Sequence, residues 1–175
     1  MKNARYILRL TLTLLLVTAV VAGLLGLVNY LTERKIAALQ NEKAESAMRE
    51  VLAADSYEPL ETDAEGVTAL YQAGGKGYVV RVSVNGFGGA IDMMVGVDLN
   101  RTVTGVSIIS HSETASLGAN CTREDFRTQF VGLAGGLAVN KDGGPIEALT
   151  GATVTSRAVT KGVDLALECV KEVLG

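Results

Sequence analysis

A cluster of hydroxyl-bearing and small side chains near the C-terminus is the best candidate of this chain for ligand chemistry. Residues 146–156 read IEALTGATVTS and lead directly into a helical pattern. Small residues let a ligand approach the backbone closely, and the first N–H groups of a helix are unpaired and electropositive. The segment therefore suits a phosphate group, with the hydroxyl of Thr155 or Ser156 beside it. An ordinary capping hydroxyl at a helix N-terminus would explain the same residues.

The helix after this segment is predicted from apolar residues that recur every three or four positions and so share one face. These residues are Val159, Val163, Leu167, Val170 and Leu174. The run DGGP at residues 142–145 interrupts the chain upstream of the segment. A shorter helix is expected over residues 122–131.

Alternating apolar and polar residues in the middle of the chain predict strands with one buried face. The pattern covers residues 78–84, 91–99 and 106–108. Glycine-rich segments at residues 74–77 and 85–89 are short enough to join antiparallel strands. Phosphate-binding glycine loops join a strand to a helix, so we interpret both segments as turns between strands.

The N-terminal region predicts a membrane anchor, because residues 10–31 contain no charged side chain. At about 1.5 Å of rise per residue this run reaches roughly 30 Å, enough to cross the hydrocarbon core of a bilayer. A cleaved signal peptide is the alternative, but it would have a shorter apolar stretch followed by an A-x-A-like site. We therefore favour an uncleaved anchor. We expect a tail at residues 1–9, a membrane helix at 10–31, a separate juxtamembrane helix at 32–54 that Thr32 caps and the segment around Pro59 ends, and a folded domain at 55–175.

The charge and the cysteine content limit the functions that this chain can have. The net charge of −3, without a basic block, argues against nucleic-acid binding. Cys121 and Cys169 form no CxxC pair and have no histidine partner nearby, which indicates two small, semi-buried apolar side chains. A disulfide between the two cysteines, on the oxidising side of a membrane, is the alternative. Basic residues flank the membrane helix on both sides and do not fix its orientation: Lys2, Arg5, Arg9, Arg34, Lys35 and Lys43.

The sequence TGATVT at residues 150–155 resembles the flavinylation motif of FMN-binding domains. Such domains occur in the G subunit of the Rnf complex and in the C subunit of the sodium-pumping NADH:quinone reductase. The resemblance implies that FMN is joined to Thr155 by a phosphoester bond, which a flavin transferase makes from FAD. It further implies flavin contacts from Thr150, Gly151, Ala152 and Thr153.

Two further segments carry the same resemblance. The sequence GFGGAI at residues 86–91 is similar to the family's glycine-rich turn and strand, and HSETASLG at residues 111–118 resembles its flavin loop, H-x-E-T-P-G-L-G. Ala115 and Ser116 stand where the family has Pro-Gly, and Glu147 stands where Asp is frequent upstream of the flavinylation motif. The loop implies flavin contacts from Glu113, Thr114, Leu117 and Gly118.

Lys141 and His111 are weaker candidates for the flavin site. A cation near the flavin would favour its anionic reduced form, which gives Lys141 a role, but a solvated loop lysine fits the sequence equally well. His111 is the only histidine. A lone histidine at the end of a strand is usually structural, and a proton-handling role is the alternative.

Together these features predict an α+β fold, with a transmembrane helix followed by an FMN-binding domain of mainly antiparallel sheet and flanking helices. The resemblance implies a redox-carrier subunit of an Rnf-type ferredoxin:NAD oxidoreductase rather than a stand-alone enzyme. Other subunits of the complex and a flavin transferase are the implied partners. The C subunit of the quinone reductase and a membrane-tethered flavin-binding regulatory module are the alternatives. Because the family's transferase works outside the cytoplasmic membrane, we expect the tail inside and the FMN domain outside.

Overall fold

The computed structural model describes residues 2–175, and side chains throughout that range except residues 2–5, 34–38, 40 and 41. The flanking charges predicted at Lys2, Arg5, Arg34 and Lys35 lie outside the described side chains. The chain divides into two compact units, one ending at Glu42 and the other comprising Lys43–Gly175.

The first helix, α1, runs without interruption from Lys2 to Val51. Its segment Tyr6–Glu33 is long and apolar enough to cross a membrane. The predicted second helix beginning at a Thr32 cap is wrong, because the Thr32 hydroxyl donates instead to the carbonyl of Val28 at 2.6 Å, inside the helix. Such a bond to the carbonyl four residues back leaves the helix free to continue.

A five-stranded antiparallel sheet with the strand order β1-β2-β3-β4-β5 forms the centre of the second unit. The α+β prediction is thereby confirmed. The strands are β1 (Tyr57–Leu60), β2 (Val67–Ala73), β3 (Gly77–Asn85), β4 (Ala90–Asp98) and β5 (Val103–His111). The last three match the predicted strands, except that Leu99 follows the end of β4. The two glycine-rich segments form the β2–β3 and β3–β4 turns.

The alternation pattern does not predict strands β1 and β2. Pro59 indicates a stop for the preceding helix, but in the structure it lies within β1. Proline has no N–H to donate and is tolerated on an edge strand, which is the position of β1 in the sheet.

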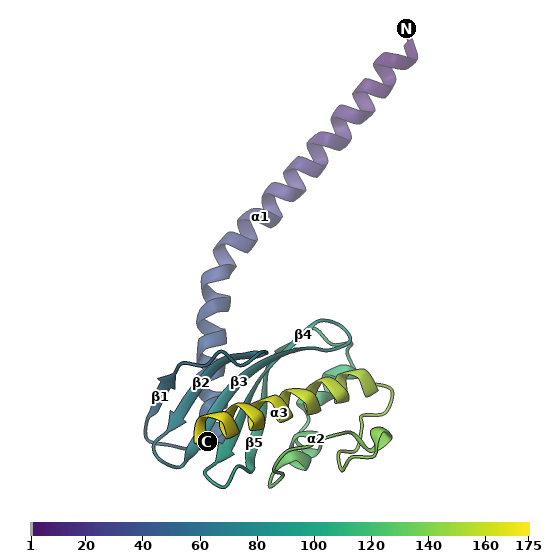
Figure 1. Cartoon of the computed structure of the whole chain (residues 1–175). Coiled ribbons are helices and arrows are strands. Elements are labelled where there is room, and N and C mark those ends of the chain that lie inside the picture. Colours follow the sequence, from purple (N-terminus) through teal and green to yellow (C-terminus); the bar gives the residue numbers. More distant parts are fainter. Residues whose placement is uncertain (1) are drawn as a thin grey trace. The chain divides into compact units, whose positions relative to one another are not determined.

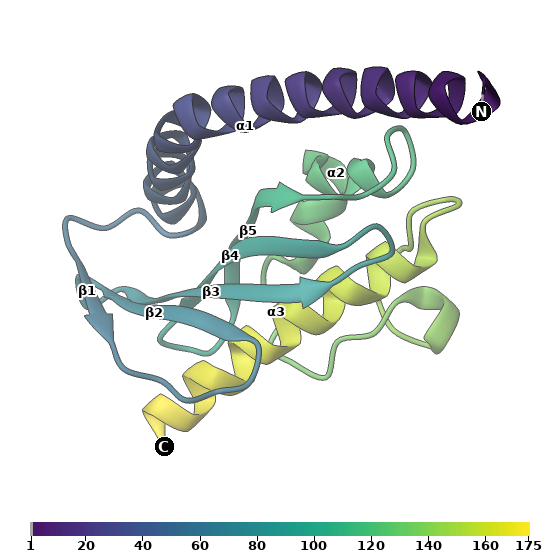
Figure 2. The same ribbon diagram turned by 90° about the horizontal axis from the view of Figure 1, so that it is seen from above.

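One face of the sheet is covered by the C-terminal helix α3 (Thr153–Leu174), as Figures 1 and 2 show. The predicted apolar face of this helix packs into the main core, where Val159, Val163 and Val170 are fully buried beside Val80 and Val82 of β3. This packing fixes the position of the first turn of α3, which carries the end of the TGATVT segment.

The opposite face of the sheet is also buried, which corrects the prediction of one-sided strands. The last two turns of α1 place Ala44, Ala47 and Val51 in a second apolar cluster that includes Val79 and Met94. The alternation pattern assigns Met94 to the solvated face, because its neighbours Met93 and Val95 occupy the buried one. Alternation indicates which residues share a face, but not whether a second element covers the other face.

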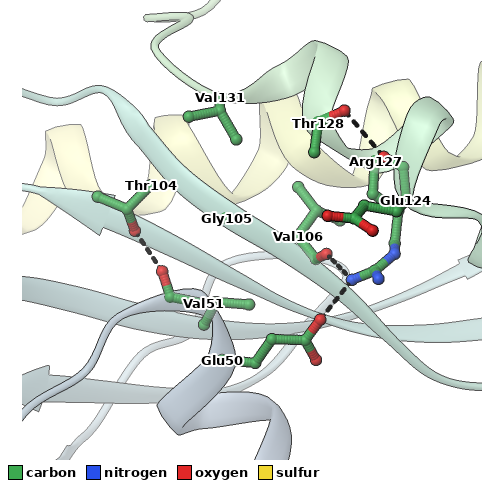
Figure 3. A pocket seen from close by; sticks show the side chains of 9 residues that line it. All are labelled: Glu50, Val51, Thr104, Gly105, Val106, Glu124, Arg127, Thr128 and Val131. Atoms are coloured by element: carbon green, nitrogen blue, oxygen red, sulfur yellow. Dashed lines mark hydrogen bonds and ion pairs between the residues drawn. The ribbon is translucent and has the colours of Figure 1, made fainter.

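Polar contacts join the end of α1 to the edge of the sheet (Figure 3). The Thr104 hydroxyl donates to the carbonyl of Val51 at 2.6 Å. The Arg127 guanidinium donates to the Glu50 carboxylate and to the Val106 carbonyl, both at 2.7 Å. Residues Lys43–Val51 therefore belong structurally to the sheet unit.

The helix predicted over residues 122–131 is broken into short turns. They are the 3-10 helix η1 (Gly118–Thr122), the four-residue helix α2 (Glu124–Arg127) and the 3-10 helix η2 (Thr128–Phe130). Phe126 and Phe130 pack edge to face with ring centroids 5.6 Å apart and anchor these turns in the core. A further 3-10 turn, η3 (Asn140–Asp142), precedes the TGATVT segment.

Candidate functional site

Thr155 lies in the first turn of α3, where it is 1% exposed. Its hydroxyl donates to Glu113 Oε2 at 2.6 Å. The N-cap of α3 is Ala152, which makes no side-chain capping bond. The ordinary capping interpretation of Thr155 is therefore wrong, because its hydroxyl bonds to a carboxylate from another part of the chain.

Ser156 has a different environment. Its hydroxyl donates to the Ala152 carbonyl at 3.0 Å and accepts a bond from the Leu149 N–H at 2.9 Å. Both bonds lie within the turn that leads into α3, and Ser156 is fully buried. Ser156 thus stabilises the local backbone, and of these two neighbouring residues only Thr155 lines the adjacent cavity.

Glu113 is held by the loop that follows β5. Its second carboxylate oxygen, Oε1, accepts a bond from the Gly88 N–H at 3.0 Å, so each oxygen has a donor. A Cβ atom added at Gly86 or Gly118 would overlap the Glu113 carboxylate. The two glycines therefore leave the space that the carboxylate occupies between the β3–β4 turn and η1.

A cavity of about 390 Å³ opens beside these residues. Its volume falls in the range of roughly 300–1,000 Å³ that is typical of cofactor sites. The structure brings nine of the ten predicted contact residues together in its lining: Glu113, Thr114, Leu117, Gly118, Lys141, Gly151, Ala152, Thr153 and Thr155.

Thr150 is the predicted residue that the structure does not bring to this cavity. It is exposed and lines a separate surface hollow with Arg123 and Glu147. Phe87 and Val154 line the cavity but were not predicted as contacts. Both are exposed apolar side chains within the quoted motifs, 73% and 48% exposed, and this exposure is visible only in the folded chain.

Lys141 brings a positive charge to the cavity. Its ammonium donates to the Thr153 hydroxyl at 3.1 Å. The neighbouring Asp142 carboxylate accepts two bonds of 2.7 Å from Arg157, which ties η3 to the first turns of α3. An ammonium group and the unpaired N–H groups of a helix N-terminus together suit a phosphate, so the residues fit the phosphate end of FMN.

His111 contacts the loop backbone rather than the cavity. Its Nδ1 accepts a bond from the Glu113 N–H at 3.2 Å, which favours the structural role over proton handling. Ser116 has a left-handed φ of 64°. The family's glycine at this position adopts such a backbone freely, whereas a residue with a Cβ is strained by roughly 1–2 kcal/mol. The loop thus keeps a glycine-like conformation without the glycine.

Cys121 and Cys169 are both free and buried. Burial raises the pKa of the Cys121 thiol to about 11, and the nearby negative charge of Glu113 contributes to this increase. Cys121 belongs to η1, whereas Cys169 lies in the C-terminal half of α3. Because both thiols are free, the structure has no disulfide between Cys121 and Cys169. Among the described residues, no group of three or more His, Cys, Asp or Glu side chains is placed to hold a metal ion.

Comparisons with known proteins agree with this geometry. Residues 86–168 match the family model of the FMN-binding domain, and residues 1–51 match that of the RnfG N-terminal region. A crystal structure of the C subunit of Na(+)-translocating NADH-quinone reductase from Parabacteroides distasonis shares the fold. It superposes with a TM-score of 0.55 at 20% identity, over 76% of this chain and 83% of that one. The fold and the site thus define an FMN-binding domain behind an apolar N-terminal helix.

Two curated relatives make the assignment specific. The G subunit of the ion-translocating oxidoreductase complex of Methanosarcina acetivorans is 35% identical, over 97% of both chains. The G subunit of the proton-translocating ferredoxin:NAD(+) oxidoreductase complex of Clostridium ljungdahlii is 36% identical, over 92% of this chain and 90% of its own length. The chain belongs to the RnfG family, the G subunits of ion-translocating oxidoreductase complexes.

Proposed function

We propose that this protein is the electron-transferring G subunit of an Rnf-type ion-translocating oxidoreductase, with FMN joined by a phosphoester bond to Thr155. Family membership supports the electron-transfer role and the use of FMN. The observation that supports the covalent bond is the Thr155 hydroxyl, which lines the cavity at the N-terminus of α3 and has a carboxylate partner at 2.6 Å.

The chain's own residues have distinct tasks in this proposal. The first turn of α3 and Lys141 bind the phosphate, Thr155 retains the cofactor, and the apolar side chains of Phe87, Leu117 and Val154 contact the flavin. When bound, FMN supplies the electron-transfer chemistry. A covalent bond keeps the flavin in place during repeated electron transfer.

The C subunit of a sodium-translocating quinone reductase is the second candidate, because that protein has the same fold. Identity to that structure is 20%, whereas the two G-subunit relatives reach 35% and 36% over almost the whole chain. The assignment as a G subunit is therefore the better supported one. The remaining subunits of the complex and a flavin transferase are the proposed partners, and α1 is the proposed membrane anchor.

The covalent bond is tested with the full chain co-expressed with a flavin transferase. The intact mass should rise by one FMN minus water, and the flavin fluorescence should survive a denaturing gel. Thr155→Val should abolish this fluorescence, whereas Ser156→Ala, which removes the adjacent hydroxyl, should retain it. Flavin that is released completely by acid precipitation would contradict covalent attachment. Flavin fluorescence in the Thr155→Val protein would mean that another residue carries the bond.

The Thr155→Val protein must also be shown to be folded. The substitution leaves Glu113 Oε2 without its hydroxyl donor, and an unpaired buried acceptor costs about 1–3 kcal/mol. We therefore expect a lowered but cooperative thermal unfolding transition. Loss of fluorescence together with a folded protein assigns the bond to Thr155.

A further inference from the structure

The bond between Thr155 and Glu113 joins a candidate nucleophile to a carboxylate, and both residues are buried. Thr155 is 1% exposed and Glu113 is 8% exposed. A threonine hydroxyl is a weak nucleophile and is activated in enzymes by an adjacent base that accepts its proton. Here the acceptor oxygen is 2.6 Å away, within the reach of about 2.6–3.2 Å that such a transfer requires.

The backbone around Glu113 keeps this carboxylate directed at the hydroxyl. The Gly88 N–H binds Oε1 and leaves Oε2 for Thr155. A Cβ added at Gly118 would overlap Oε2 and come within 2.8 Å of Thr155 Oγ1, so glycine at this position allows the contact. Two other groups that could be considered as proton acceptors make different hydrogen bonds. Lys141 lines the same cavity but donates to Thr153, and His111 accepts a bond from a backbone N–H.

We propose that Glu113 is the catalytic proton acceptor in the reaction that joins the flavin phosphate to Thr155, an inference that rests on the proposed covalent attachment. In this step a bond forms between Thr155 Oγ1 and the FMN phosphorus of FAD. The phosphoanhydride bond to the AMP half breaks, and AMP leaves. The Thr155 hydroxyl proton moves to Glu113 Oε2, so the acceptor protein carries its own base and the transferase supplies FAD.

The charge balance after the reaction supports the same role. A phosphodiester on Thr155 is an anion and no longer offers a hydroxyl donor to Glu113. A carboxylate left in place would then face a second negative charge in a buried site, which is unfavourable. Transfer of the proton neutralises Glu113 in the same step and removes this repulsion.

The first test compares the rate of flavin incorporation into the full-length apoprotein, by a purified flavin transferase with FAD, for wild type and Glu113→Gln. Glutamine keeps the shape of the side chain but not its basicity, and we expect the rate to fall about 100-fold or more. Glu172→Gln is the matched control, because Glu172 is exposed and lies near the other end of α3. It should react at the wild-type rate.

Chemical rescue separates a base from a structural residue. In Glu113→Ala, added formate can reach the vacated space through the cavity, and we expect it to raise the incorporation rate roughly tenfold or more over chloride at equal ionic strength, as for a restored general base. Rescue that is no better than with chloride would overturn the proposal, as would a Glu113→Gln rate equal to that of wild type. If wild type itself gains no covalent flavin, the proposed function fails instead, and the two failures are thereby distinguished.

Discussion

Thr155 and Ser156 are adjacent hydroxyls in the same turn, yet their hydrogen-bond partners differ completely. Ser156 bonds to its own turn, whereas Thr155 bonds to Glu113, which is 42 positions away in sequence. Successive residues of a helix point about 100° apart, so the hydroxyls of Thr155 and Ser156 face different surroundings. The direction of α3 relative to the β5 loop selects Thr155.

The cysteines give a prediction at the same scale. Both thiols are buried, and burial raises the pKa of Cys121 to about 11. A thiol reacts as its thiolate, so below this pKa Cys121 is protonated as well as shielded. A thiol-reactive dye at mildly alkaline pH should label neither cysteine in the native protein and both after denaturation without reductant. Failure to label both in the denatured protein would show a disulfide and contradict the two free thiols of the structure.

At the scale of elements, the close approach of α1 to the sheet depends on two glycines opposite Val51. A Cβ added at Gly96 would lie 2.5 Å from the Val51 carbonyl oxygen, and one added at Gly105 would lie 2.9 Å from the Val51 Cα. Both neighbours are backbone atoms and cannot move aside as a flexible side chain would. The last turn of α1 is therefore matched in shape to the β4–β5 pair.

Gly96→Ala should accordingly push α1 away from the sheet and destabilise the domain by about 1–3 kcal/mol, the usual cost of overpacking. Ser110→Ala is the control, because Ser110 is exposed on the neighbouring strand. The measurement is thermal or urea unfolding of both variants beside wild type. An unchanged midpoint for Gly96→Ala would mean that α1 does not pack on β4 as the structure has it.

At the scale of the whole molecule, the orientation in the membrane remains a prediction. The segment Tyr6–Glu33 is suited to span a bilayer, but the charges on either side are balanced. The proposed flavin attachment requires Thr155 to be on the same side as the transferase, which in this family works outside the cytoplasmic membrane. We therefore expect residues 1–9 inside and the FMN domain outside.

Two reporter fusions after Gly175 test this orientation. A reporter that is active only after export should be active, and a reporter that is active only in the cytoplasm should be silent. The opposite pattern would contradict both the orientation and the proposed route of flavin attachment. The Thr155→Val chain, which lacks the proposed attachment residue for the flavin, is fused in the same way. It controls for any effect of the flavin on membrane insertion.

The sequence alone predicted the features that depend on local periodicity and local motifs. These include an apolar run long enough to span a membrane, the three central strands, the apolar face of α3 and nine of the ten predicted contact residues, which line the cavity. Each depends on the spacing of residues within a short segment, or on two motifs whose order in the chain is characteristic of the family. Such signals are present before the chain folds.

The tertiary structure decided everything that requires two distant segments to meet. The burial of Met94 depends on α1 crossing the second face of the sheet, and the exclusion of Thr150 depends on the direction of the turn before α3. The pairing of Thr155 with Glu113 depends on α3 and the β5 loop packing against the same sheet. Periodicity assigns a residue to a face of its own element, but only packing determines which other element that face contacts.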